Sequence, residues 1–269
     1  MPIAVNTIRD LPHYRRDAFT AGFEALGYKM ETISKKPRSR EDTLILWNLH
    51  GSNETLRRDW EANSGTVIVA ENGFIGQDAN GIQLYAIAVH GHCGSGWCPV
   101  GYEDRFAKLG IELKPWQEKP DGHILICGQR GLGSRAMASP PQFEEKTAKQ
   151  LGSSGHHKTI KIRKHPGLVK PSTTLEQDLE GARVCVVWSS ASGVKALTLG
   201  IPVVYAAPHW ICAGAAGKGL SAVDAPPRDD VARREAMHRM AFAQWTIAEI
   251  ASGMPFARIM AEIGDAKWP

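Results

Sequence analysis

The sequence predicts an α/β protein with two parallel-sheet domains, and three observations support this fold class. Short apolar, β-branched runs such as Thr43–Trp47 and Arg183–Trp188 are typical of strands that a parallel sheet buries on both faces. These runs alternate with helical patterns along most of the chain, as strand–helix–strand units require. Residues 113–122 show neither period and contain two prolines, so we expect a link between the two domains there.

Length and composition limit the classes of protein that are possible. A chain of 269 residues can form one large or two small domains with substantial cores. The net charge of +4 and an isoelectric point near 8.8 permit a nucleic-acid partner but do not require one. No run of about 18 apolar residues is present and the first residues lack a signal-peptide pattern, so we expect no membrane partner. Five scattered cysteines suit a reducing compartment, which predicts a cytoplasmic location.

The first predicted domain, residues 1–112, begins with strand–helix units and then becomes rich in loops. Its expected strands are Ile3–Ile8, Tyr28–Ile33, Thr43–Trp47, Thr66–Ala70 and Ile82–Val89. Its expected helices are His13–Leu26, Glu54–Ala62 and Arg105–Leu109. His50 and Glu71 follow two of the strands, and such strand ends face the ligand crevice of an open α/β sheet. Gly73 predicts a tight turn close behind Glu71.

The second predicted domain, residues 123–269, repeats the alternation. Its expected strands are His123–Cys127, Thr159–Arg163, Arg183–Trp188 and Val203–Tyr205. A helix that ends at Gly200 should connect the last two strands. Apolar residues at helical spacing predict one long helix over Asp230–Ala251, and a short helix over Pro255–Ile263 follows it. We expect these C-terminal helices to pack back on the first domain. The predicted layout is therefore two Rossmann-like domains that face a cleft.

Two strand ends of the second domain carry the features of an anion site. Ser189, Ser190 and Ser192 follow a buried strand, and any of them could cap the next helix. The backbone N–H groups of such a helix N-terminus favour a phosphate. A neighbouring strand ends in His165, with Lys161, Arg163 and Lys164 around it. Because both strand ends would face one anionic ligand, the pattern indicates a nucleotide.

Several short motifs resemble those of GT-B glycosyltransferases, particularly the bacterial sialyltransferase and capsule Kdo-transferase groups. These groups share a His-Pro motif, here His165-Pro166, and a serine turn that opens a helix before a Gly-x-Pro-Val stop, here Ser189–Val203. Their acidic pair before a glycine is matched by Glu71-Asn72-Gly73. The chain also resembles short phage-encoded proteins of this type, through the His92–Trp97 loop, a Gln-Arg-Gly-Leu-Gly-Ser segment and a Gln244–Gly253 tail. Two positions depart from the pattern: Asn72 replaces the second carboxylate, and Lys195 stands where many relatives have a ribose-binding glutamate.

The resemblance implies a GT-B-like, metal-independent glycosyltransferase that needs no cofactor and uses a nucleotide sugar, possibly a UDP-sugar, as co-substrate. The first domain would bind the acceptor, with Glu71 as the general base and His50 as the reserve base. The second domain would bind the donor. The residues expected to contact the donor are Gln129, Arg130, Arg163, His165, Ser189, Ser190, Ser192 and Gly193.

The crowding of His90, His92, Cys93 and Cys98 raises the possibility of zinc, but the second cysteine pair of a usual structural site is missing, so we expect no metal.

Three functions remain open from the sequence. The phage resemblance favours a 5-hydroxymethylated pyrimidine in DNA as the acceptor, in which case the location is the host cytoplasm. Two basic segments, Lys35–Arg40 and Arg57-Arg58, could then follow DNA phosphates. The first alternative is a surface polysaccharide or another glycan as acceptor. The second is a non-catalytic nucleotide- or DNA-binding protein, which the single carboxylate at Glu71 supports.

Overall fold

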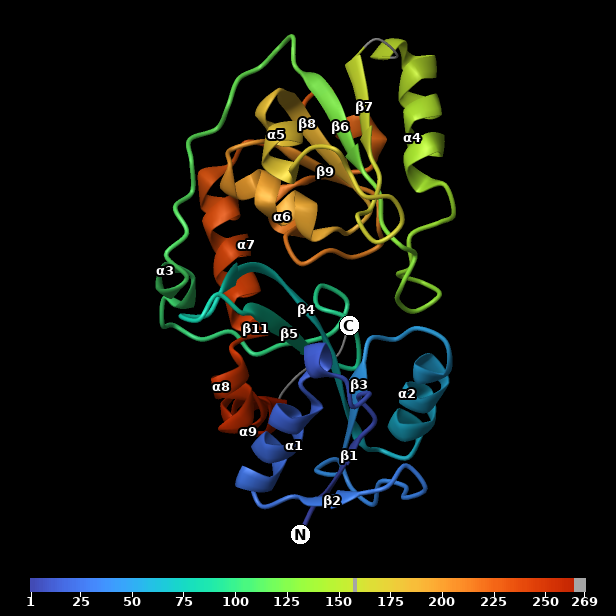
Figure 1. Ribbon diagram of the computed structural model, residues 1–269, viewed down its shortest axis with the longest axis vertical. Helices are drawn as coiled ribbons and strands as arrows, with labels where there is room; N and C mark the ends of the chain where they lie inside the picture. The colour runs from blue at the N-terminus through green and yellow to red at the C-terminus, as the bar shows by residue number, and fades with distance from the viewer. Residues whose placement is uncertain (157–158, 264–269) are drawn as a thin grey trace. The chain divides into compact units, whose positions relative to one another are not determined.

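A computed structural model describes residues 1–156 and 159–263 of the chain (Figure 1). The chain forms two compact units. Unit 1 contains Met1–Arg105, Gly133–Arg135 and the described part of Arg239–Pro269, whereas unit 2 contains Phe106–Leu132 and the described part of Ala136–His238. Each unit is built on one sheet in which parallel pairing dominates, with helices packed against it. This confirms the predicted fold class of two Rossmann-like units.

Unit 1 has a six-stranded mixed sheet in the order β11-β5-β4-β3-β1-β2. Its strands are β1 (Ile3–Asn6), β2 (Lys29–Glu31), β3 (Thr43–Trp47), β4 (Thr66–Gln77), β5 (Gln83–Val89) and β11 (Gln244–Trp245). The first four pair in parallel, and β5 and β11 are antiparallel to their neighbours. Since β1, β3 and β4 begin at one edge of the sheet, this amino edge and the opposite carboxyl edge are distinct surfaces.

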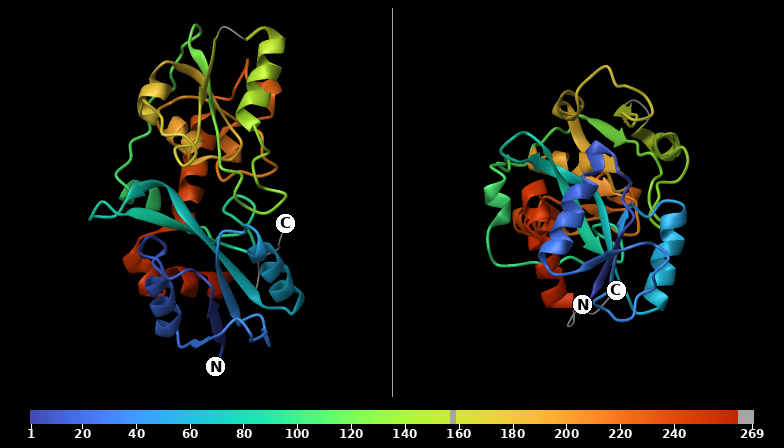
Figure 2. Two further views of the ribbon diagram at one scale, coloured as in Figure 1. Left: turned by 45° about the vertical axis from the view of Figure 1, so that its right-hand side comes forward. Right: turned by 60° about the horizontal axis from the view of Figure 1, so that its bottom comes forward.

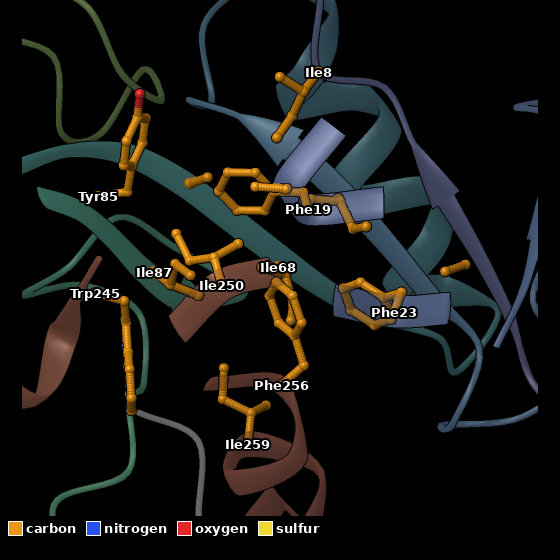
Figure 3. Packing of buried hydrophobic residues seen from close by; sticks show 14 of the residues in the cluster. Ile8, Phe19, Phe23, Ile68, Tyr85, Ile87, Trp245, Ile250, Phe256 and Ile259 are labelled. Carbon is orange, nitrogen blue, oxygen red and sulfur yellow. The ribbon is translucent and has the colours of Figure 1, made fainter. Parts of the chain in front are cut away.

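Two groups of helices cover opposite faces of the unit 1 sheet (Figures 1 and 2). Helix α1 (Arg16–Ala25) packs with α8 (Ile247–Ala251) and α9 (Met254–Glu262), and Figure 3 shows Phe19 and Phe23 close to Phe256 in the shared core. Helix α2 (Ser52–Ala62) covers the other face, where Trp60 packs on Leu44, Leu46, Val67 and Val69.

The contact between α1 and α8 depends on Gly22. A Cβ atom at this position would lie 2.1 Å from the carbonyl oxygen of Ile250 and 2.7 Å from the ring of Phe256. We expect Gly22→Ala to lower the free energy of unfolding by about 1–3 kcal/mol, because the helices must separate to admit the methyl group. Urea denaturation of the variant measures this loss.

Glu24→Ala provides the control for Gly22, because Glu24 lies on the exposed side of the same helix. It should leave the denaturation midpoint nearly unchanged. Helix propensity alone predicts that Gly22→Ala stabilises by about 1 kcal/mol. A stabilised variant would therefore contradict the close approach of α1 and α8.

Unit 2 has a five-stranded parallel sheet in the order β10-β9-β8-β6-β7. Its strands are β6 (His123–Cys127), β7 (Ile160–Arg163), β8 (Ala182–Val187), β9 (Val203–Tyr205) and β10 (Gly217–Lys218). Its helices are α4 (Phe143–Leu151), α5 (Leu175–Glu180) and α6 (Ala191–Thr198). The chain passes between the units in α3 (Arg105–Lys108) and α7 (Asp230–Ala243). No helix in residues 1–156 and 159–263 is long and apolar enough to span a membrane.

The predicted helix over Asp230–Ala251 is wrong, because Gln244 and Trp245 interrupt it as strand β11 on the edge of β5. The side-chain oxygen of Gln244 accepts from the backbone N–H of Phe74 at 2.9 Å, and its amide nitrogen donates to the carbonyl of Ile75 at 2.6 Å. Thr246 then caps α8. These long-range bonds satisfy backbone groups of β4. The stability they contribute outweighs the preference for a helix that the spacing of apolar residues indicates.

The predicted turn at Gly73 is also wrong. Strand β4 continues through this position to Gln77 and keeps pairing with β5, with an irregular register after Asn72. A Cβ atom at Gly73 would lie 2.6 Å from the carbonyl oxygen of Leu84. Close strand pairing, rather than a turn, therefore requires the glycine.

Candidate active site

The strand order of unit 2 creates a switch point between β6 and β8. Numbered along the chain from β6, the spatial order is 2-1-3-4-5, so the connections leave β6 and β8 in opposite directions across the sheet. In open parallel sheets, ligands bind at the carboxyl ends of the strands that flank such a point. Here those ends lead directly into Gly128-Gln129-Arg130 and Trp188-Ser189-Ser190.

The two strand ends are bonded to one another through Gln129. Its side-chain oxygen accepts the backbone N–H of Ser189 at 2.7 Å, and its amide nitrogen lies 3.4 Å from Oγ of the same serine. The structure thus brings together two residues that the sequence assigns to donor binding. The half-buried Gln129 fixes the entry into helix α6.

The serine turn is a helix cap. Oγ of Ser190 accepts the backbone N–H of Ser192 at 3.1 Å, and the two hydroxyl oxygens lie 3.2 Å apart. Gly193 is explained by packing, because a Cβ atom there would lie 2.8 Å from the ring of Trp210. Ser190 and Ser192 therefore define the start of the helix, and Gly193 allows it to pack closely.

His165 and Arg130 both lie close to Gly167. A Cβ atom on this glycine would be 3.1 Å from both Cδ of Arg130 and Nδ1 of His165. Nδ1 of His165 accepts the backbone N–H of Gly167 at 2.9 Å, so a neutral ring carries its proton on Nε2. Burial and, secondarily, the charge of Arg130 lower the pKa of His165. The imidazole is thus a neutral hydrogen-bond donor at neutral pH.

The cations predicted around His165 are used inside unit 2. Arg163 forms an ion pair with Asp178 and donates to the carbonyl of Thr173 at 3.0 Å. Nζ of Lys161 lies 2.7 Å from the same aspartate. Lys164 pairs with the carboxylates at the start of α4, Glu144 and Glu145. Arg130, in contrast, is exposed and has no ion pair within the described residues, which leaves its guanidinium available for a ligand.

In unit 1, Glu71 is held by two donors from the loop after β5. Its Oε1 accepts the backbone N–H of Cys93 at 3.0 Å, and its Oε2 lies 3.3 Å from Nδ1 of His92. Nε2 of His92 accepts the backbone N–H of Leu49 at 3.1 Å, which assigns the proton of a neutral ring to Nδ1, facing Glu71. The carboxylate is one-quarter exposed, and each oxygen keeps a second lone-pair direction for another donor.

His50, the reserve base, lies exposed just before α2. Its neighbour Leu49, not His50, is the residue linked to His92 and so to Glu71. Within the described residues no contact joins His50 to Glu71. The sequence did not identify His92 as the partner of Glu71, although its place in the His92–Trp97 motif was the available signal.

Of the four residues considered for zinc, the two histidines contact carboxylates and the two cysteines are free thiols. His90 lies 2.7 Å from Glu61, and His92 contacts Glu71. Burial and the neighbouring Glu71 raise the pKa of the Cys93 thiol, and burial raises that of Cys98 to about 11. Within the described residues no group of three or more histidine, cysteine, aspartate or glutamate side chains is arranged to hold a metal ion.

Comparison with known proteins identifies the fold. No protein-family model matches the chain. No curated protein matches it either. Among solved structures, the β-Kdo 2,7 transferase of KpsC from Thermosulfurimonas dismutans superposes with a TM-score of 0.53 at 14% identity, covering 96% of this chain and 100% of that one. The β-Kdo 2,4 transferase of the same protein gives 0.49 at 14% identity, with 90% of each chain covered. The chain therefore shares the two-unit fold of a glycosyltransferase structure.

Proposed function

We propose that the chain is a glycosyltransferase that moves a sugar from a nucleotide-sugar donor to an acceptor hydroxyl. The observation that supports this most is the fold shared with a β-Kdo 2,7 transferase over 96% of the chain. In this proposal the units have separate roles: unit 2 binds the donor, and unit 1 supplies the base. Donor candidates are the UDP-sugars expected from the sequence and nucleotide-activated Kdo.

Donor phosphates would bind at the carboxyl edge of the unit 2 sheet. Departure of the sugar leaves negative charge on the phosphate, and catalysis requires donors that already point at this charge. Arg130 supplies a cation, and Nε2–H of His165 supplies a neutral donor beside it. The start of α6, fixed by Ser190, adds the partial positive charge of a helix N-terminus. These groups would stabilise the leaving nucleotide without a metal.

Glu71 would act as the general base. An acceptor hydroxyl loses its proton as its oxygen attacks the anomeric carbon, and a carboxylate within hydrogen-bond reach can take that proton. The contacts with Cys93 and His92 orient the carboxylate while leaving lone pairs for the substrate. His92 acts through Glu71 and is therefore a positioning residue.

A glycan fits the surface of unit 1 better than DNA does. The DNA prediction came from the phage resemblance, with two basic segments as possible phosphate contacts. Of the six cations in these segments three form ion pairs: Arg57 with Glu61, Arg58 with Glu54, and Arg38 with Asp42. Pairing weakens the attraction of these three side chains for phosphates. We therefore place a glycan first as acceptor and retain 5-hydroxymethylated pyrimidine in DNA as the second class.

A mass-spectrometric transfer screen tests the function. The protein is incubated with a panel of UDP-sugars and nucleotide-activated Kdo, and with acidic oligosaccharides, hydroxymethylcytosine DNA, hydroxymethyluracil DNA or plain DNA. We expect a mass increase of one sugar on an oligosaccharide. Transfer to hydroxymethylated DNA alone would overturn the glycan assignment. Neither transfer nor donor hydrolysis would indicate the non-catalytic binding protein.

His165→Ala should weaken donor binding by about 1.5–3 kcal/mol, the usual loss of a hydrogen bond to a charged group. Titration calorimetry with the donor that is active in the screen measures the effect. His123→Ala is the control, because His123 begins β6 at the opposite edge of the sheet and should leave affinity unchanged. Equal donor affinities of wild type and His165→Ala would remove His165 from the donor site.

A further inference from the structure

Unit 1 contains a cavity that the proposed chemistry does not use. Its volume is about 540 Å³, within the range of roughly 300–1,000 Å³ typical of small-molecule sites. Residues that precede strands β3 and β4, Arg40 and Gly65, contribute to its wall, as does Val89 at the end of the antiparallel strand β5. The cavity therefore lies at the amino edge of the sheet, whereas ligands of open α/β sheets usually bind at the carboxyl edge.

This amino-edge pocket is distinct from the Glu71 site. None of Glu71, His92 and Cys93 belongs to its lining. Glu71 lies six positions beyond Gly65 along β4, roughly 20 Å of extended chain, but Ser95 of the lining donates to the carbonyl of His92 at 3.0 Å, so the loop side of the pocket lies near the Glu71 site. One loop nevertheless contributes to both places, because Trp97 lines the pocket and His92 contacts Glu71.

The charges of the pocket suit a ligand with one anionic group. Arg40 and Arg57 bring two positive charges to the lining and Glu61 brings one negative charge, before any charge on His90 is counted. Burial raises the pKa of Glu61, but hydrogen bonds from His90 and Arg57 outweigh this and lower it, so Glu61 is ionised. Because the arginines outnumber the carboxylate, the lining suits a ligand that carries a carboxylate or a phosphate.

Donors remain available for that anion. Arg57 contacts both oxygens of Glu61 through Nη1 alone, at 2.8 and 2.6 Å, and a guanidinium has five N–H groups. Within the described residues the Nε–H of Arg57 has no acceptor. Arg40 is exposed and forms no ion pair in the described part of the chain. Both arginines can therefore turn toward an oxyanion, for which the planar guanidinium is the preferred partner.

The rest of the lining suits a sugar ring. Trp97 offers an aromatic surface, which packs well on an apolar ring face. Ser64, Ser95 and the carboxylate of Glu61 supply acceptors and donors for ring hydroxyls. We propose that the amino-edge pocket binds an acidic sugar, a monosaccharide unit that carries one carboxylate or one phosphate. This binding depends on unit 1 alone and does not require transferase activity.

Ligand-detected NMR and titration calorimetry on the full chain test the proposal, with glucuronic acid, glucose 6-phosphate and glucose as probes. We expect one or both acidic sugars to bind at least tenfold more tightly than glucose, and their order identifies the preferred anion. Equal binding of all three sugars, or binding of none, would overturn the proposal. Full competition by inorganic phosphate at the same concentration as the sugar would show that the ring contributes nothing and would overturn the sugar assignment.

Variants locate the binding. Arg40→Gln and Arg57→Gln should each weaken the acidic sugar about tenfold. Arg58→Gln is the matched control, because Arg58 is the next residue of α2 but is exposed and pairs with Glu54 outside the pocket. If Arg57→Gln fails to fold, the affinity of Arg40→Gln for the acidic sugar tests the site by itself, since Arg40 is exposed and outside the core. Unchanged affinity in the Arg40 and Arg57 variants would refute the site.

Glu71→Gln separates this inference from the proposed function. It should lower turnover by roughly 10²–10⁴-fold yet leave the affinity for the acidic sugar unchanged, because Glu71 does not line the pocket. Loss of sugar binding in Glu71→Gln would mean that the sugar binds at the Glu71 site, and the amino-edge assignment would then be wrong. Absence of transfer in the wild type, with binding retained, would leave this inference standing and the proposed function rejected.

Discussion

Glu71→Gln is expected to lower turnover by roughly 10²–10⁴-fold, the usual contribution of a general base, while donor affinity changes little. Glutamine has nearly the shape of glutamate but cannot take the acceptor proton. The donor contacts assigned to Arg130 and His165 belong to unit 2, so calorimetry should report the wild-type donor affinity. Steady-state kinetics with the acceptor found in the transfer screen measures the loss.

The substitution also affects the hydrogen bonds around residue 71. Glu71 accepts from the N–H of Cys93 and faces the Nδ1 proton of His92, and a glutamine amide can accept at one of these positions only. A second variant separates this structural loss from loss of the base. Glu71→Asp keeps the carboxylate and should retain more activity than Glu71→Gln.

His50 provides the competing assignment. If Glu71 is the base, His50→Ala should keep near-normal turnover, because His50 is exposed and has no contact with Glu71 within the described residues. If His50→Ala abolishes turnover while Glu71→Gln retains it, the base is His50. If neither variant slows transfer, neither residue of unit 1 acts as the base.

Local pattern predicted the parts of this protein that depend on neighbouring residues. The strands at Thr43–Trp47 and His123–Cys127 have the bounds expected from the sequence, since each is a continuous apolar run between polar ends. A cap among the serines at 189–192 was also predictable, because a helix cap forms between residues only two or three positions apart, here Ser190 and Ser192. Gln129 and Ser189 were expected at one site because parallel strand ends share an edge.

Contacts between distant residues could not be predicted in this way. Gln244 forms a strand because its side chain binds β4 about 170 positions away in the sequence, which no helical period reveals. The cations Lys161 and Arg163 suggested an external phosphate, but both form ion pairs with Asp178. Asp178 belongs to α5, and the sequence does not show that this helix lies beside β7. A count of positive residues in a sequence does not show which of them are already paired.

Asp178→Asn is expected to lower the free energy of unfolding by about 3–5 kcal/mol, the cost of removing one partner from a buried ion pair. The aspartate side chain is 3% exposed and that of Arg163 is 10% exposed. Besides its ion pairs with Arg163 and Lys161, the carboxylate accepts from Oγ1 of Thr173 at 2.7 Å. Asparagine can accept one or two of these bonds but carries no charge, so Arg163 would stay buried without an anionic partner.

The same contacts determine how acid affects stability. Burial alone would raise the pKa of Asp178, but hydrogen bonds from Lys161, Thr173 and Arg163 lower it below its ordinary value. A carboxyl group with a depressed folded-state pKa contributes stability above its unfolded pKa of about 3.9 and loses it as pH falls through the folded value. Urea denaturation from pH 7 down to pH 2 should therefore show that the wild type loses its higher free energy of unfolding relative to Asp178→Asn below about pH 4.

Asp224→Asn is the control, because its side chain is 71% exposed and its ion pairs with His156 and Arg183 should contribute at most about 1 kcal/mol. Equal losses in the two variants at pH 7 would contradict a structural role for the Asp178 ion pairs and would make Arg163 available again as a phosphate ligand.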